Sequence, residues 1–287
     1  MILKYKTDEH VFDENKEEGV LFLTYPLLTE CDLVQHGFST RIGGVSEGVY
    51  SSMNLSFGRE DLPENVEENF HRISRVLNIK QSNMVFSHQT HTTNIKVVTA
   101  KDRGKGIKIP RDFENIDGMI TNIPEVCLVT FYADCVPLFF VDPIKKVIGL
   151  THSGWRGTVG KIGARTIQAM EHEFGSKPKD ILAAIGPSIC QDCYEVSEDV
   201  ILEFKETFKK QEQGDLFYKK DNGKYQLNLW EANKKILMQA GINRKNLAVS
   251  NLCTCCNPNE LFSHRASRGQ RGNLAAFLSF KKEVTAK

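Results

Sequence analysis

Residues 126–157 read VCLVTFYADCVPLFFVDPIKKVIGLTHSGWRG, and this stretch decides the fold class. It holds apolar runs at 126–133, 138–142 and 147–151. Such continuous runs are typical of strands in sheets that are covered on both faces. Asp142-Pro143-Ile144-Lys145 separates the last two runs and indicates a turn, because proline sets the backbone angle of the second turn position. We therefore predict an antiparallel hairpin at the centre of the chain.

The flanking sequence alternates between further strands and amphipathic helices, which predicts an α+β fold with antiparallel pairing. A short pattern, FSxR followed by NL and a nearby Phe, occurs at 38–57 and again at 262–277 and suggests an internal duplication. No low-complexity linker divides the chain, so we expect residues 1–287 to form a single domain. The further strands are predicted at 84–98, 181–185 and 247–252, and the helices at 63–79, 156–174, 197–210 and 229–240.

The composition argues against several classes of function. The 37 Lys and Arg residues nearly balance the 36 Asp and Glu residues, which gives a net charge of +1 and no lopsided field for non-specific binding to nucleic acid or membranes. No apolar run approaches the roughly 18 residues that span a bilayer. Residues 1–18 have no apolar central stretch of the kind found in signal peptides. We expect a cytoplasmic protein, monomeric or a small homo-oligomer, whose cysteines are free thiols or metal ligands.

The hairpin register brings a thiol and an imidazole together. If Asp142 and Lys145 flank the turn, facing residues have numbers that sum to about 287, and Cys135 faces His152. Facing side chains have β-carbons about 4.5–5.5 Å apart, which lets both share one metal ion. A bulge at Gly149 or Pro137 would shift this register by one residue. A lone cysteine is more often a core residue, so the pairing alone does not establish a metal site.

The residues around this pair favour a functional site. Asp134 places a charge at the end of a buried run, where it needs a specific partner. Residues 151–157 form a glycine-flanked turn into a helix, where backbone N–H groups can bind an anion and Arg156 can add a phosphate contact. A third ligand is expected from residues 87–91, where His88 and His91 would point to opposite faces of an extended segment. The residues alone leave the choice between these two histidines open.

Five motifs, found in the same order along the chain, are similar to those of one known family. The chain resembles the family long labelled "polyphenol oxidase, laccase domain", the YlmD/YfiH type, whose members look like purine nucleoside phosphorylases. The resemblance runs from about His36 to Phe277. The motifs are Gln89-Thr90-His91, Ala133-Asp134-Cys135-Val136-Pro137, Thr151 to Gly157, Gly186-Pro187-Ser188-Ile189 with Tyr194-Glu195-Val196, and Cys253-Thr254 with Phe262-Ser263-His264-Arg265.

The resemblance implies a ligand set and a reaction. It makes His91, Cys135 and His152 both the metal ligands and the catalytic residues, with one Zn²⁺ per chain and copper as the less favoured metal. It implies phosphorolysis of adenosine, inosine and methylthioadenosine, with some deamination of adenosine. It also implies a central β-sandwich flanked by helices and related to a group of cysteine hydrolases. His264 stands where the family commonly has Tyr, which leaves the role of that position open.

Phosphorolysis breaks the bond between ribose and base through an oxocarbenium-like state, so the protein must hold phosphate beside the anomeric carbon. Arg41, in a glycine-rich loop, and Arg156 are the predicted phosphate contacts, and Asn54 could orient phosphate or ribose. Deamination also needs a proton carrier. Asp134 and Glu195 are the acidic residues near the motifs, and both could instead be structural.

Four other cysteines compete for metal. Cys190-x-x-Cys193 and Cys253-x-x-Cys256 have the spacing of a four-cysteine zinc site. Cys255 lies inside the second pair, and the two pairs are much farther apart in sequence than in small zinc ribbons. The sequence leaves a second metal at these cysteines open.

Three alternative functions differ in what they require of the same residues. A cysteine hydrolase would use Cys135 as nucleophile and His152 as base. A multicopper oxidase would need repeated histidine motifs, which eight scattered histidines do not form. A non-catalytic, metal-dependent protein would bind a nucleoside without cleaving it.

Overall fold

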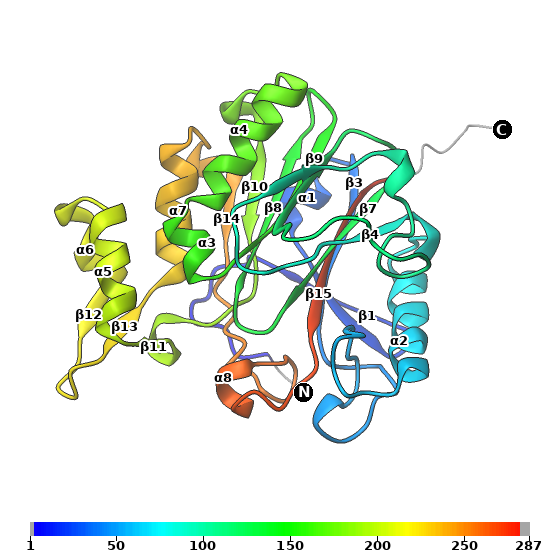
Figure 1. The fold of residues 1–287 in the computed structure, drawn as a ribbon, viewed down its shortest axis with the longest axis horizontal. Coiled ribbons are helices and arrows are strands. Elements are labelled where there is room, and N and C mark those ends of the chain that lie inside the picture. Colours follow the sequence, from blue (N-terminus) through cyan, green and yellow to red (C-terminus); the bar gives the residue numbers. More distant parts are fainter. Residues whose placement is uncertain (1–2, 282–287) are drawn as a thin grey trace.

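In the computed structural model, which describes residues 3–281, the strands form two six-stranded sheets and one small sheet (Figure 1). The first sheet has the order β1 (Asp13–Glu17), β2 (Val20–Thr24), β3 (Val34–Ser39), β15 (Leu274–Phe280), β7 (Cys127–Tyr132) and β4 (Met84–Phe86). The second has the order β14 (Leu247–Val249), β10 (Leu182–Ile185), β8 (Val136–Asp142), β9 (Val147–Ser153), β6 (Gly118–Thr121) and β5 (Ile95–Val97). The small sheet pairs β11 (Glu195–Val196), β13 (Tyr225–Leu227) and β12 (Phe217–Lys219).

The helices cover the outer faces of the paired sheets. Helix α2 (Pro63–Val76) lies on the first sheet, and α4 (Ile162–Phe174) and α7 (Leu229–Gln239) lie on the second (Figure 1). Helices α5 (Glu198–Thr207) and α6 (Gln213–Leu216) accompany the small sheet at one edge of the molecule (Figure 1). The remaining short helices are α1 (Pro26–Thr29), α3 (Trp155–Val159) and α8 (His264–Ser267).

Alternation along the central strands explains this layering. In β7, Leu128 points into the core between the two sheets, whereas Cys127 and Val129 pack beneath α2. In β8, Phe139 points between the sheets and Phe140 points toward the helices α4 and α7. Both faces of these strands are therefore buried, which accounts for their continuous apolar sequence. The predicted α+β class, with mixed sheets flanked by helices, is confirmed.

The central hairpin forms, but with a different register. Asp142 pairs with Val147 and Pro137 with His152, so the numbers of paired residues sum to 289 rather than 287. The loop has four residues instead of two, because the Asp142 carboxylate accepts from the N–H groups of Ile144 and Lys145 and Lys146 is left-handed. Cys135 thus lies diagonal to His152 and not opposite it. A shift of two residues keeps both side chains on one face.

Several other predicted elements were wrong in extent; α2 ends at Val76 and not at 79, and β14 ends at Val249 and not at 252. The strand predicted at 84–98 is two strands in different sheets, β4 and β5, joined by a polar crossover at residues 87–94. The helix predicted at 156–174 is divided into α3 and α4, because Lys161 adopts a left-handed conformation between them. Helix α5 ends at Thr207, before the predicted 210. Within residues 3–281, no helix is long and apolar enough to cross a membrane.

Candidate metal centre

Three side chains from distant parts of the chain meet at one end of the second sheet. His91 lies in the crossover between β4 and β5, Cys135 directly precedes β8, and His152 is in β9. One donor atom from each lies within 4.8 Å of the other two, and Cys135 Sγ is 3.9 Å from His91 Nε2. His152 is buried, whereas His91 is exposed. The structure thus brings together the three predicted ligands.

Asp117, which precedes β6, holds two of these ligands in place. Its buried carboxylate accepts a hydrogen bond from His152 Nδ1 at 2.8 Å and others from the backbone N–H groups of Thr90, His91 and Thr92. Burial alone would raise the pKa of Asp117, but these partners outweigh it and lower the pKa to about 2. Because the ionised carboxylate only accepts, His152 Nδ1 carries a proton, and Nε2 is the nitrogen that could bind a metal ion once it is deprotonated. A carboxylate that orients a histidine in this way is typical of metal sites.

The centre has an unusual charge state for buried groups. Burial opposes ionisation of the Cys135 thiol, but His152 and His91 outweigh it and lower the pKa of Cys135 to about 6. Burial also disfavours the charged form of His152, but Cys135 and Asp117 outweigh it and raise its pKa to about 9. A thiolate and an imidazolium therefore face each other at neutral pH. A thiolate is the form that binds metal, and His152 would give up its proton to an ion.

The donor set and the space around it fit a metal ion. Two imidazoles and one thiolate are borderline and soft ligands, suited to zinc or copper, and three protein ligands leave a fourth position open. Gly154 lies against the donors: a Cβ there would come within 2.8 Å of the His91 ring and 3.2 Å of Cys135 Sγ. The absence of a side chain at Gly154 keeps room for an ion between the ligands.

The three ligands open into a cavity of about 470 Å³. Three arginines, Arg59, Arg111 and Arg271, line it together with His88 and the aromatic rings of Phe57 and Phe131. Among the residues that the structure describes, no Asp or Glu lines it. The cavity is therefore positively charged and suited to an anion.

Arg271 is half-buried and lies near Arg59. Burial and the nearby Arg59 lower its pKa to about 10. Its guanidinium donates to the Gly272 carbonyl and to the Asn273 side chain, while its buried Nε has no hydrogen-bond partner among the described residues. A buried donor without a partner is costly, and an anion in the cavity would supply one. Sequence reasoning missed these three arginines, since Arg59 and Arg111 lie in loops without a motif and Arg271 precedes the last strand.

Comparison with known proteins shows the family. The family model described as "Multi-copper polyphenol oxidoreductase laccase" matches residues 35–281. The chain belongs to this family. It is 37% identical to "Purine nucleoside phosphorylase YlmD" of Bacillus subtilis over 85% of this chain and 88% of the relative. It is also 37% identical to "Purine nucleoside phosphorylase" of Deinococcus radiodurans over 88% and 92% of the two chains. The resemblance to the YlmD/YfiH type is confirmed.

A solved structure of the family has the same fold. The crystal structure of Bacillus licheniformis hypothetical protein YfiH superposes with a TM-score of 0.88 at 33% identity, covering 95% of this chain and all of that one. The mixed sheets and flanking helices described above are thus the fold of the YlmD/YfiH family. The predicted internal duplication and the relation to cysteine hydrolases stay predictions.

The geometry also distinguishes the two histidines of the crossover. His88 lines the cavity but lies outside the ligand cluster, and its Nδ1 accepts from the Asn115 N–H at 3.1 Å. His91 has a left-handed backbone with φ of 64°, which Asp117 stabilises through the His91 N–H. The crossover is therefore not the extended segment assumed from the sequence. The choice of His91, which the family resemblance implied, agrees with the observed cluster.

The residues predicted to hold phosphate or ribose lie elsewhere. Arg41 donates to the carbonyls of Ser51 and Pro258 and stacks on Phe262, which ties two loops together. Asn54 is fully buried, and its side-chain amide is used by Asp61 and by the N–H groups of neighbouring backbone. Arg156 is exposed on α3 and packs over the Trp155 ring. None of the three lines the cavity, so the arginines that do so are the stronger phosphate contacts.

The two acidic residues proposed from the sequence have structural partners. Asp134 is buried and accepts from the Thr254 hydroxyl at 2.6 Å and from the Arg265 N–H at 2.7 Å. Glu195 pairs with Lys220 at 2.5 Å and accepts from Asn222 at 3.2 Å in the small sheet. Neither lines the cavity. These contacts favour the structural interpretation of both.

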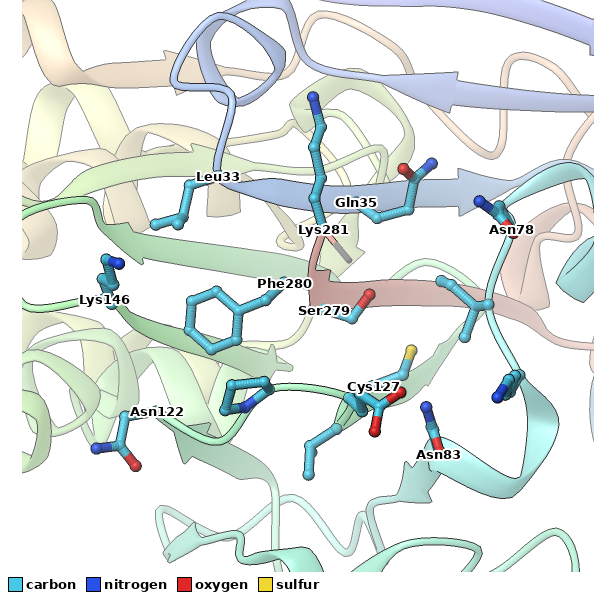
Figure 2. A pocket seen from close by; sticks show the side chains of 15 residues that line it. Leu33, Gln35, Asn78, Asn83, Asn122, Cys127, Lys146, Ser279, Phe280 and Lys281 are labelled. Atoms are coloured by element: carbon cyan, nitrogen blue, oxygen red, sulfur yellow. The ribbon is translucent and has the colours of Figure 1, made fainter. Parts of the chain in front are cut away.

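A larger cavity of about 840 Å³ is lined by none of the three ligands; Figure 2 shows the residues that line it. It is surrounded by the end of β15, including Ser279 and Phe280, and by the start of β7 with Cys127 (Figure 2). Burial raises the pKa of the Cys127 thiol to about 12, so this cysteine is neutral and unreactive. The larger cavity holds none of the predicted site residues.

Proposed function

We propose that this chain is a zinc-dependent purine nucleoside phosphorylase. It cleaves adenosine, inosine and methylthioadenosine with phosphate, releasing the free base and ribose 1-phosphate or its methylthio analogue. One observation carries the proposal: a three-ligand metal cluster opens into a cavity lined by three arginines and no carboxylate. Support also comes from the relatives named purine nucleoside phosphorylase.

The arginines give the cavity its anion specificity. Arg59 and Arg271 are close enough for the charge of one to lower the pKa of the other, and a phosphate dianion between them would relieve this repulsion. Guanidinium groups bind phosphate oxygens in pairs, which fixes the orientation of the nucleophile as well as its position. We therefore assign phosphate binding to Arg271 and Arg59, with Arg111 as a further arginine of the cavity lining.

The metal would be held by His91, Cys135 and His152. A zinc ion bound there supplies an electrophile that stabilises negative charge on an oxygen or on a leaving group. The bond from phosphate oxygen to the anomeric carbon forms as the glycosidic bond breaks, and the purine nitrogen leaves with the electron pair and takes up a proton. His88 is the cavity histidine outside the ligand set and is our candidate for moving that proton.

Deamination of adenosine is proposed as a side activity of the same cavity. It needs a proton carrier beside the purine amino group, and no carboxylate from residues 3–281 lines the cavity. His88 replaces Asp134 and Glu195 as the candidate for this role. We expect deamination to be slower than phosphorolysis, because a carboxylate carrier is missing.

One observation favours a second candidate function. Cys135 and His152 form a thiolate–imidazolium pair, and Asp117 orients His152 through Nδ1. The same order of groups, nucleophile, base and orienting carboxylate, is found in cysteine hydrolases. In that case the protein would be active without metal and would form a covalent intermediate at Cys135.

The test is a product analysis with the protein's zinc content measured in parallel. The protein is incubated with adenosine, with and without phosphate, and adenine, inosine and ribose 1-phosphate are identified. We expect phosphate-dependent adenine and ribose 1-phosphate, both lost in Cys135→Ser together with the zinc at this site. Binding of adenosine without any product, in zinc-loaded protein, would overturn the proposal and leave a binding protein. Activity that survives metal removal, with labelling of Cys135, would instead support the hydrolase.

A further inference from the structure

Four cysteines outside the candidate metal centre converge from two loops. Cys190 and Cys193 lie between β10 and β11, and Cys253 and Cys256 follow β14. Their four sulfur atoms all lie within 4.8 Å of one another, with Cys193 Sγ and Cys256 Sγ 3.5 Å apart. All four are free thiols in the structure. The sequence alone left a metal site at these four cysteines open, and the structure brings their sulfur atoms together.

We infer that these four cysteines hold a second zinc ion with a structural role, independent of the proposed phosphorylase activity. Zn–S bonds of about 2.3 Å in a tetrahedron place sulfur atoms about 3.8 Å apart, close to the separations seen here. Four thiolates fill every position, which is the pattern of a structural site that has no room for substrate. Cys190 and Cys253 are buried, and Cys193 and Cys256 are half-buried, so the ion would be shielded from solvent.

The surrounding backbone already has the form of a zinc-binding turn. The Cys190 N–H donates to Cys253 Sγ at 3.2 Å, a contact that stabilises a thiolate. The Cys193 N–H donates to the Cys190 carbonyl at 3.2 Å and closes the first Cys-x-x-Cys turn. The two loops are joined by a bridge between Ser188 and Cys253. The sulfur atoms are therefore held together by the fold and not by one flexible loop.

Positive groups lie beside the cluster and would balance its charge. A zinc ion with four thiolates has a net charge of −2. The Lys6 ammonium is close enough to interact electrostatically with Cys190 and Cys256, although it also pairs with the Asp192 carboxylate at 2.9 Å. Arg265 donates to the Cys193 carbonyl at 3.1 Å. These cations reduce the cost of gathering four thiolates.

The same two loops hold the residue before Cys135. The Ile189 N–H donates to the Asp134 carbonyl at 3.0 Å from the first loop. Thr254 donates to the Asp134 carboxylate from the second loop, and the Arg265 N–H does so from helix α8, which follows that loop. A zinc ion that joins the loops would therefore fix the left-handed Asp134 backbone, and with it the position of Cys135. We assign the four-cysteine site the role of a clamp behind the candidate metal centre.

The test counts zinc per chain by elemental analysis of purified protein. The whole chain should contain two zinc ions, the double variant Cys193→Ser/Cys256→Ser one, and Cys135→Ser/His152→Ala one. X-ray absorption of the last variant should show zinc with four sulfur ligands at about 2.3 Å. Cys255→Ser is the matched control in the same loop and should keep both ions. These measurements do not depend on catalysis, so a chain with two zinc ions and no phosphorylase activity would contradict only the proposed function.

Three results would overturn the inference. One is a whole chain that binds a single zinc ion, which Cys135→Ser removes. Another is a disulfide in place of the metal, seen as a mass lower by two hydrogen atoms and a loss of titratable thiols under reducing-agent-free purification. The third is zinc in Cys135→Ser/His152→Ala with nitrogen or oxygen ligands instead of four sulfurs. If the double cysteine variant fails to fold, the absorption spectrum of the zinc that Cys135→Ser/His152→Ala retains still decides.

Discussion

Asp117 shows how one residue can organise a site to which it contributes no metal ligand. Its carboxylate accepts from the His152 ring and from three consecutive N–H groups of the crossover that carries His91. The backbone of His91 is left-handed, which is unfavourable for a residue with a side chain, and the Asp117 contact compensates. Two ligands from different segments thus depend on one buried carboxylate. No motif marked this residue in the sequence, because its partners are mostly backbone groups.

We expect Asp117→Asn to lower zinc affinity about 10- to 100-fold, as is common when a group orienting a metal-bound histidine is changed. The amide cannot accept from all five donors, which include the Thr92 hydroxyl, and it leaves His152 free to rotate. Affinity would be measured by competition with a chelator. Asp142→Asn is the matched control, since Asp142 is equally buried but caps the hairpin loop. Equal affinity in both variants would show that Asp117 has no role in holding the ligands.

Cys135 should be unusually reactive in metal-free protein. Its pKa of about 6 means that the thiolate form is lost as pH falls through 6 and fully present above it. Alkylation by iodoacetamide should therefore reach half its maximal rate near pH 6, against about 8.5 for an ordinary cysteine. Peptide mass spectrometry would follow Cys135, with the remote Cys31 as internal reference. In Asp117→Asn the midpoint should rise, because the imidazolium loses its stabilising carboxylate; a midpoint near 8.5 in the unchanged chain contradicts the ion pair.

Arg271→Gln should raise the KM for phosphate about ten- to a hundredfold, since a hydrogen bond to a charged group contributes about 1.5–3 kcal/mol. The KM for the nucleoside should change little, because the substitution removes only the positive charge of the phosphate region. Initial rates at varied phosphate would measure it. Arg268→Gln is the control, an exposed arginine three residues away. A larger effect on the KM for the nucleoside than on the KM for phosphate would mean that Arg271 contacts the nucleoside and not the phosphate.

Among the elements, the crossover at residues 87–94 decides the geometry of the centre. It leaves β4 in the first sheet and enters β5 in the second. Gln89 secures its start, since its side chain donates to the Phe131 carbonyl and accepts from the Phe131 N–H, both at 2.7 Å. The amide side chain thereby pairs with β7 as a neighbouring strand would. This explains physically why a glutamine stands two residues before the ligand His91.

Gln89→Ala should reduce zinc affinity by up to roughly thirtyfold while the fold is kept, because two net hydrogen bonds contribute about 1 kcal/mol each. The expected cause is greater mobility of the crossover backbone, which would be seen as faster amide hydrogen exchange at residues 88–94. Zinc affinity and amide exchange would be compared with those of the control variant Gln35→Ala. Gln35 is a half-buried glutamine of β3 that lines the larger cavity. Faster exchange without loss of affinity would mean that the crossover does not position His91.

The hairpin shows what sequence reasoning could and could not predict at this scale. Its strands, its antiparallel pairing and the approach of Cys135 to His152 followed from apolar runs and a proline turn. The loop length did not, because it depends on the Asp142 carboxylate bonding to two N–H groups and on a left-handed Lys146. The error was two residues, and the side-chain period of a strand is also two. The ligand pair therefore stayed on one face despite the wrong register.

For the whole molecule, the layers of sheets and helices could be predicted from the sequence, but the arrangement of strands within them could not. Continuous apolar strands indicated sheets buried on both faces, and the sandwich between α2 and the α4–α7 layer bears this out. The order of strands was not predictable, since β15 from the end of the chain lies between β3 and β7. The cavity arginines were missed for the same reason, because Arg59, Arg111 and Arg271 meet only after three distant segments assemble. The spacing of motifs along the sequence does not show which distant segments come together in the fold.

Zinc at His91, Cys135 and His152 should stabilise the whole molecule, because its ligands come from a crossover between the sheets, from the residue before β8 and from β9. At free zinc a hundred times Kd, binding adds about 2.7 kcal/mol to the free energy of unfolding. For a chain of this size that corresponds to a rise in Tm of roughly 5 °C. Calorimetry at graded zinc concentrations would measure it in the whole chain and in Cys135→Ser, where the part of the rise due to this site should vanish. An unchanged zinc dependence in Cys135→Ser would mean that the stabilising ion binds elsewhere.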